Sequence, residues 1–139
     1  REYYKFTVMR NPWDLVVSWH AFHKKYNKIR AELREFSEWV FDGMPTHWDN
    51  KKIDGTMWGD PLDYSQWIDR FSDYDCIAKT ETLQADFDVI CDQINIPKRI
   101  IPRSNRSERP PYREFYTDKT RQIVHDKYIK YIKHFNYKF

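Results

Sequence analysis

The chain has 139 residues, of which 40% are hydrophobic and 18% aromatic, so it has enough apolar side chains for the core of one domain and is not an intrinsically disordered segment. Its 24 basic and 21 acidic residues give a formal net charge of +3, which is too small to indicate a nucleic-acid-binding protein. The sequence contains no run of about 20 apolar residues, so no segment of it is expected to span a membrane.

The first predicted elements are a short strand, Tyr4 to Met9, and an amphipathic helix that starts at Pro12. Asn11 is a favourable N-cap, and Pro12 suits the first helical position because proline has no N–H to leave unpaired. Helix N-termini attract anions, since their first N–H groups lack partners within the helix and the peptide dipoles are positive there. Ser18 lies on the same helix face about 10 Å further along the axis. Arg10 can reach along that face, so Arg10 and Ser18 are predicted to bind one phosphate group.

Apolar residues recur at i, i+4, i+7 and i+11 in four stretches, which is the pattern of helices with one apolar face. The four stretches start at Leu15, Ile29, Leu83 and Val124. No glycine or proline separates the first two, so they form either one bent helix or two helices, with Asn27 as the preferred break. The third helix is expected to end near Asn95 and Pro97, and the fourth to start at Thr117 and Asp118.

One further stretch has the composition of a strand, Tyr74 to Ala78, and it too is followed by a helix. The alternation of strand and helix predicts an α/β fold with a parallel sheet, which is normally covered on both faces and has more than two strands. We therefore expect a single domain over residues 1–139 that lacks part of its sheet. Cys76 and Cys91 have no metal-ligand spacing and are expected to be free core residues, although an oxidising compartment would allow them to pair.

Three stretches then carry a resemblance to a known family. They are FTVMRNPWDLVVS (Phe6–Ser18), YDCIAKTETLQADF (Tyr74–Phe87) and IPRSNRSERPPYREFY (Ile101–Tyr116). In order and spacing they resemble sulfotransferases that use 3′-phosphoadenosine 5′-phosphosulfate, above all carbohydrate sulfotransferases. The first stretch is similar to the 3′-phosphate-binding element of that family, except at Leu15, where a second arginine is common.

The resemblance implies a helix-rich part of a parallel-sheet fold related to P-loop nucleotide hydrolases. The first strand and the phosphate loop that holds the 5′-phosphosulfate have no counterpart in this sequence, so the chain resembles the C-terminal part of a sulfotransferase that is truncated at its N-terminal side. Lys79 and Thr80 follow a strand, as the residues of a phosphate loop do. No glycine lies near them to let the backbone close around a phosphate, so they are not assigned that role.

The activity implied by the resemblance is transfer of a sulfuryl group from 3′-phosphoadenosine 5′-phosphosulfate to a hydroxyl, with a carbohydrate as acceptor and no metal. Arg10 and Ser18 would hold the 3′-phosphate, and the late loop with Arg106 and Ser107 would close over the nucleotide. In similar enzymes the catalytic base lies upstream of the first strand seen here, so no base is assigned. This chain by itself is expected to be inactive or weakly active unless an N-terminal segment complements it.

The 19 residues from Gly43 to Pro61 contain all three glycines and few periodic apolar residues, which predicts a long loop. Long loops in compact domains are often functional. Within this loop, His47 and the adjacent Trp48 are the residues best placed to contact an acceptor. The histidines do not form a set of metal ligands, so no metal site is expected.

Two other classes of protein were compared with this interpretation. A noncatalytic module that binds RNA or an acidic polysaccharide would place aromatic and basic residues together on an exposed face, but the aromatic residues here fall on the apolar helical stripes, where burial explains them. A phosphoryl-transfer enzyme would need a phosphate loop or magnesium-binding residues, and the sequence shows neither. The five arginines from Arg99 to Arg113 form either a nucleotide-contacting loop or a solvated one; the resemblance favours the first.

Overall fold

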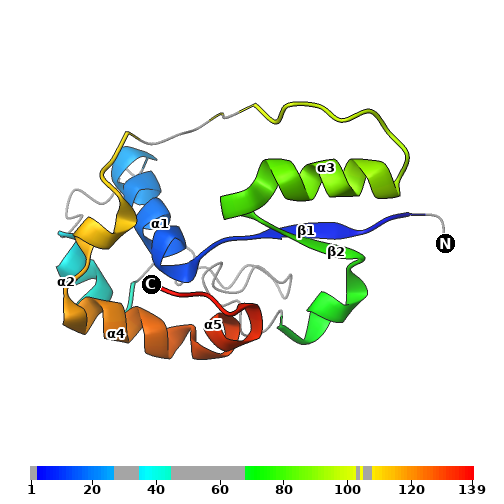
Figure 1. Cartoon of the computed structure of the whole chain (residues 1–139). Helices are drawn as coiled ribbons and strands as arrows, with labels where there is room; N and C mark the ends of the chain where they lie inside the picture. The colour runs from blue at the N-terminus through cyan, green and yellow to red at the C-terminus, as the bar shows by residue number, and fades with distance from the viewer. Residues whose placement is uncertain (1–2, 27–34, 45–67, 103, 105–107) are drawn as a thin grey trace, which may run out of the picture.

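A computed structural model of the chain describes residues 3–26, 35–44, 68–102, 104 and 108–139. Within these residues, the strands β1 (Phe6–Met9) and β2 (Cys76–Lys79) form a two-stranded sheet. The strands run parallel, with Phe6 opposite Cys76 and Met9 opposite Lys79. The predicted α/β class with parallel pairing is confirmed at this level, although each strand starts two residues later than the sequence suggested. Figure 1 shows α3 lying along the sheet, with α1, α2, α4 and α5 gathered toward one end of it.

The structure describes five α-helices. They are α1 (Pro12–Tyr26), α2 (Phe36–Phe41), α3 (Leu83–Gln93), α4 (Asp118–Lys127) and α5 (Ile129–Phe135). Of these, α1, α3 and α4 start at the residues that the caps and the apolar stripes indicate. α1 and α2 are separate helices, because Glu35, which precedes α2, has extended backbone angles of φ −53° and ψ 151°. Of the second apolar stripe only Phe36 and Val40 belong to α2, since Ile29 and Leu33 lie outside the described residues. Asn27, the expected position of the break, lies outside the described residues.

The fourth predicted helix consists of two helices, α4 and α5, that meet at Tyr128. Helical hydrogen bonding continues across the junction, since the N–H of Tyr128 donates to the oxygen of Val124 at 3.1 Å and the N–H of Ile132 donates to the oxygen of Tyr128 at 2.8 Å. Val124, Tyr128 and Tyr131 are all buried. The apolar stripe is therefore kept through a local distortion of the helix, which a periodic sequence pattern does not reveal.

The predicted end of the third helix and the predicted start of the fourth are both confirmed. The hydroxyl of Thr117 accepts a hydrogen bond from the N–H of Thr120 and forms a capping box at the start of α4. Asn95 has a positive φ of 57° just after α3. The N–H groups of Asn95 and Ile96 donate to the oxygens of Asp92 and Cys91, which is the Schellman arrangement that ends a helix.

The main core lies between α1, α2 and the two helices that follow α3 in the chain. Most of its buried members come from α1, α2, α4 and α5, together with the last residue of β1, and they include Met9, Trp13, Val16, Val17, Phe36, Val40, Val124 and Tyr131. α1 packs against α4 and against the short 3-10 turn η4 (Tyr112–Phe115). The start of α1, at Pro12, is thus held by residues about a hundred positions later in the sequence, such as those of η4 from Tyr112 onward.

On the other side of the molecule, α3 packs against β2. Cys91 of α3 is buried and Cys76 of β2 is half-buried, and both are free thiols, as predicted. Among the residues that the structure describes, no helix is long and apolar enough to cross a membrane.

Truncation of Val124 to alanine is expected to lower the free energy of unfolding by about 2 kcal/mol, because its two methyl groups are fully buried in the main core. The matched control is Val89→Ala, the same change on α3 at a side chain that is 54% exposed, which is expected to change stability by less than about 0.5 kcal/mol. Urea unfolding of both variants measures the difference. Equal losses in the two variants would contradict the assignment of Val124 to the core.

Candidate anion-binding site

The junction between β1 and α1 is formed by Arg10 and Asn11 and is fixed by hydrogen bonds from distant segments. Asn11 is buried, and its side-chain oxygen accepts the N–H of Trp13 at 3.1 Å, so it caps α1 as predicted. Its side-chain amide donates to the backbone oxygen of Lys138 at 2.9 Å, and its backbone N–H donates to a carboxylate oxygen of Glu81 at 2.6 Å. Asn11 therefore connects α1 to two other segments of the chain.

The backbone of Arg10 is held in the same way by Tyr131 of α5. The hydroxyl of Tyr131 donates to the oxygen of Arg10 at 3.0 Å and accepts from its N–H at 3.3 Å. Tyr131 is 1% exposed, so its ring has little freedom to move. The point from which the Arg10 side chain departs is consequently well fixed.

The Arg10 guanidinium lies along α1 and contacts two side chains there. Its Nε and Nη2 donate to the same oxygen of Asp14, at 2.7 Å and 2.6 Å, and its Nη1 donates to Ser18 Oγ at 3.1 Å. The three residues are spaced by four, which places them in one row on a helix face. The structure thus brings together the two residues that the sequence assigned to a phosphate, and it adds Asp14 between them.

Asp14 also binds a second arginine. Its other carboxylate oxygen is 2.6 Å from Nη2 of Arg109, which lies just before η4 in the arginine-dense segment. Sequence reasoning assigned Arg106 and Ser107 in this segment, and both lie outside the described residues. Arg109 was one of five arginines noted there without a role of its own. The sequence shows an acidic residue one helical turn beyond Arg10, but it does not indicate which of the later arginines reaches Asp14.

Arg10, Asp14 and Arg109 form a cluster that carries one excess positive charge near the N-terminus of α1, which is the end that favours anions. The carboxylate of Glu81 binds the neighbouring N–H of Asn11.

Two tyrosines border this cluster. Burial raises the pKa of Tyr116 strongly, and the negative charge of Asp14 raises it further, while its hydroxyl donates to the oxygen of Trp13 at 2.9 Å. Burial also raises the pKa of Tyr112. Both phenols therefore stay protonated at neutral pH.

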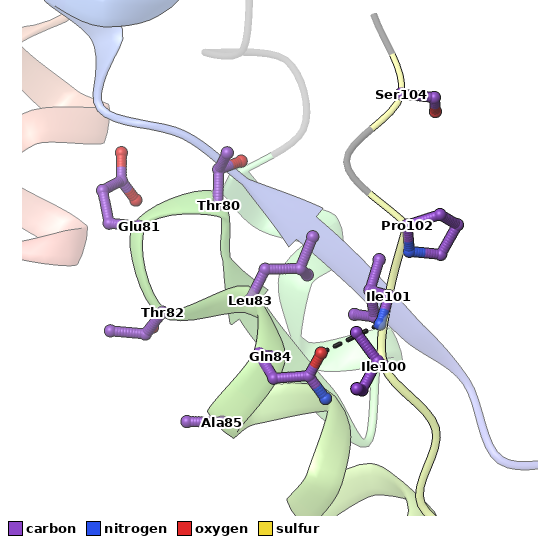
Figure 2. A pocket seen from close by; sticks show the side chains of 10 residues that line it. All are labelled: Thr80, Glu81, Thr82, Leu83, Gln84, Ala85, Ile100, Ile101, Pro102 and Ser104. Carbon is purple, nitrogen blue, oxygen red and sulfur yellow. Dashed lines mark hydrogen bonds between the residues drawn. The ribbon is translucent and has the colours of Figure 1, made fainter. Parts of the chain in front are cut away.

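A pocket of about 750 Å³ lies between the N-terminal end of α3 and residues 100–102 and 104 (Figure 2). Gln84 joins its two walls: the N–H of Ile101 donates to the side-chain oxygen of Gln84 at 2.9 Å, and the Gln84 amide donates to the oxygen of Arg99 at 3.1 Å. Glu81, which binds the N–H of Asn11, is one of the lining residues. The pocket thus shares a side chain with the strand-to-helix junction.

Other residues singled out in the sequence lie elsewhere. The ammonium group of Lys79 is 3.5 Å from the oxygen of Phe135 and 5.4 Å from the ring centre of Tyr137, and Thr80 Oγ1 donates to the oxygen of Met9 at 3.0 Å. His47 and Trp48 fall outside the described residues. Among the side chains that the structure does describe, no group of three or more His, Cys, Asp or Glu is arranged to hold a metal ion.

The fold and the site together define a class of protein. It is an α/β protein in which a strand of a parallel sheet is followed by an arginine that lies at the anion-favouring N-terminus of a helix. Comparison with known families makes the class specific. The sulfotransferase family matches residues 1–138, so the chain belongs to the sulfotransferase family.

A protein of Archaeoglobus fulgidus described only as uncharacterized is 27% identical to this chain over 119 residues, which cover 81% of this chain and 84% of that protein. No solved structure matches the chain.

Replacement of Asn11 by alanine is expected to destabilise the protein by about 2 kcal/mol, because it removes both the helix cap and the hydrogen bond from the buried Asn11 amide to the oxygen of Lys138. Asn11→Ser keeps a capping oxygen and is expected to lose about half as much. Urea unfolding of the two variants provides the measurement. Equal stability of Asn11→Ala and the parent protein would show that the junction does not depend on Asn11.

The raised pKa of Tyr116 predicts a loss of stability at alkaline pH. Below an ordinary tyrosine pKa of 10.0 the folded and unfolded states both keep the proton; above it the unfolded state loses the proton while the folded state retains it. From about pH 10 upward, the free energy of unfolding should therefore fall by up to about 1.4 kcal/mol per pH unit on account of this group. Denaturant unfolding at several alkaline pH values should show a shallower decline for Tyr116→Phe. Identical slopes would refute the assignment.

Proposed function

We propose that this sulfotransferase takes the sulfuryl group from 3′-phosphoadenosine 5′-phosphosulfate and transfers it to a hydroxyl of a carbohydrate. Membership of the family supports sulfuryl transfer in general. The observation that carries the choice of donor is the contact between Arg10 and Ser18 at the start of α1, because it offers one anion both a charged and a neutral hydrogen-bond donor. The carbohydrate acceptor rests on the resemblance of the three sequence stretches to carbohydrate sulfotransferases.

In this proposal Arg10 and Ser18 bind the 3′-phosphate and so fix the position of the whole nucleotide. Their donor atoms are 3.1 Å apart, close enough for a single phosphate group to accept from both. The charge of the guanidinium and the direction of the hydroxyl together distinguish a phosphate from a neutral ribose hydroxyl. Their contribution to rate is positional: they hold the donor so that its sulfur lies in line with the acceptor oxygen.

The pocket beside the junction is proposed to take the adenosine part of the donor. Its volume of about 750 Å³ lies within the usual range for small-molecule sites. Arg106 and Ser107 are proposed to close over the nucleotide, and His47 and Trp48 to contact the acceptor. No residue is assigned to stabilise the charge on the leaving 5′-phosphate or to remove the acceptor proton.

The donor assignment predicts a preference for nucleotides with a 3′-phosphate. In calorimetric titrations, adenosine 3′,5′-bisphosphate is expected to bind at least tenfold more tightly than adenosine 5′-phosphate, since a hydrogen bond to a charged group contributes about 1.5–3 kcal/mol. Arg10→Ala should abolish this preference and Ser18→Ala should reduce it.

Lys98→Ala serves as the control, because it removes one positive charge from an exposed pair with Asp92 near the C-terminal end of α3. It should leave the preference unchanged. Equal binding of the two nucleotides, or a preference that survives Arg10→Ala, would exclude the proposed donor site. Tighter binding of a short RNA than of the bisphosphate would favour the noncatalytic binding module instead.

A further inference from the structure

Asp14 joins two arginines that lie far apart in the sequence. Each of its carboxylate oxygens receives a different guanidinium: Oδ2 is 2.6 Å from Arg10 Nη2, and Oδ1 is 2.6 Å from Arg109 Nη2. Arg10 follows β1, whereas Arg109 lies 95 residues after Asp14. The contact is therefore made by the tertiary fold, not by the helix.

The cluster is largely withdrawn from water. The side chains of Arg10, Asp14 and Arg109 are 28%, 21% and 14% exposed, respectively. Two guanidinium groups at such a position repel each other, and a carboxylate between them offsets this repulsion. The carboxylate also limits the rotamers of two long side chains, whose ordering would otherwise oppose binding of a ligand.

We propose that Asp14 is a positioning residue that directs Arg10 and Arg109 toward the same anion, which makes Arg109 the second cation of the 3′-phosphate site. This inference rests on the proposed function. The two arginines exceed the single carboxylate by one charge, so the cluster still attracts a phosphate dianion. Arg109 comes from the segment leading into η4, which packs against α1, so the late part of the chain supplies a ligand to the site at the start of α1.

The direction in which one substitution changes the affinity for the 3′-phosphate separates a positioning role of Asp14 from a simple charge effect. Asp14→Asn preserves the shape of the side chain and removes one negative charge near the bound anion. If Asp14 only competed with the anion for the arginines, the variant would bind the 3′-phosphate more tightly than the parent protein. If Asp14 positions the arginines, the variant binds it more weakly, although its site is more positive.

The experiment compares calorimetric affinities for adenosine 3′,5′-bisphosphate and adenosine 5′-phosphate and uses their ratio as the readout. The ratio is expected to fall about tenfold in Asp14→Asn and in Arg109→Ala, as for loss of one charged hydrogen bond. Combining the two substitutions should lower the ratio little further, because Asp14 acts through the arginines. Asp14→Glu keeps a carboxylate and is expected to restore most of the ratio.

A purely structural role for Asp14, such as stabilising the first turn of α1, would lower the melting temperature without changing the ratio. The matched control is Asp92→Asn, the same chemical change at the exposed pair with Lys98, which should leave the ratio unaltered. Circular dichroism establishes that each variant is folded before it is titrated.

The outcomes distinguish this inference from the proposed function. Equal binding of the two nucleotides by the parent protein would overturn the proposed function itself. A parent protein that discriminates, combined with an Asp14→Asn variant that discriminates as well or better, would overturn the positioning role alone. If Asp14→Asn does not fold, Arg109→Ala decides the matter: a parental ratio in that variant would exclude Arg109 from the site.

Discussion

The structure depends most on the way in which Asn11 is buried at the end of β1. Its side chain caps α1 on one side and binds the backbone of Lys138 on the other, while its own N–H is held by Glu81. Buried polar groups are costly unless each finds a partner, so these contacts allow little variation in where α1 begins. The direction of α1, and with it the position of its anion-favouring end, follows from this one residue.

α1 carries the core and the candidate site on different faces. Trp13, Val16 and Val17 face the buried core, whereas the row formed by Arg10, Asp14 and Ser18 runs along another side of the helix. Because the rigid packing of one face fixes the other, the polar row is held in place without being part of the core. A site of this kind gains its geometry from the hydrophobic effect and its affinity from charge.

The C-terminal aromatic residue Phe139 packs between α1 and the segment around η4 and so holds the two together. The ring of Phe139 contacts Trp13 of α1 and Tyr112 and Tyr116 of the segment around η4, with ring centres 5.5–5.7 Å apart in edge-to-face arrangements. Arg109 stands just before Tyr112, so the same packing that seats η4 against α1 also carries its guanidinium to Asp14. Figure 1 shows the C-terminus close to the start of α1, consistent with this arrangement.

The sequence by itself determined the local features: the cap at Asn11, the spacing that places Arg10 and Ser18 in one row, the end of α3 near Asn95, and the parallel pairing of two strands. Each of these depends on residues within a few positions of one another or on a repeating pattern. Only the tertiary structure decided that α4 and α5 divide at Tyr128 and that Arg109 meets Asp14. The contact of Arg109 with Asp14 arises from the packing of segments 95 residues apart. The periodicity of a sequence does not show which of five neighbouring arginines this packing places beside the carboxylate.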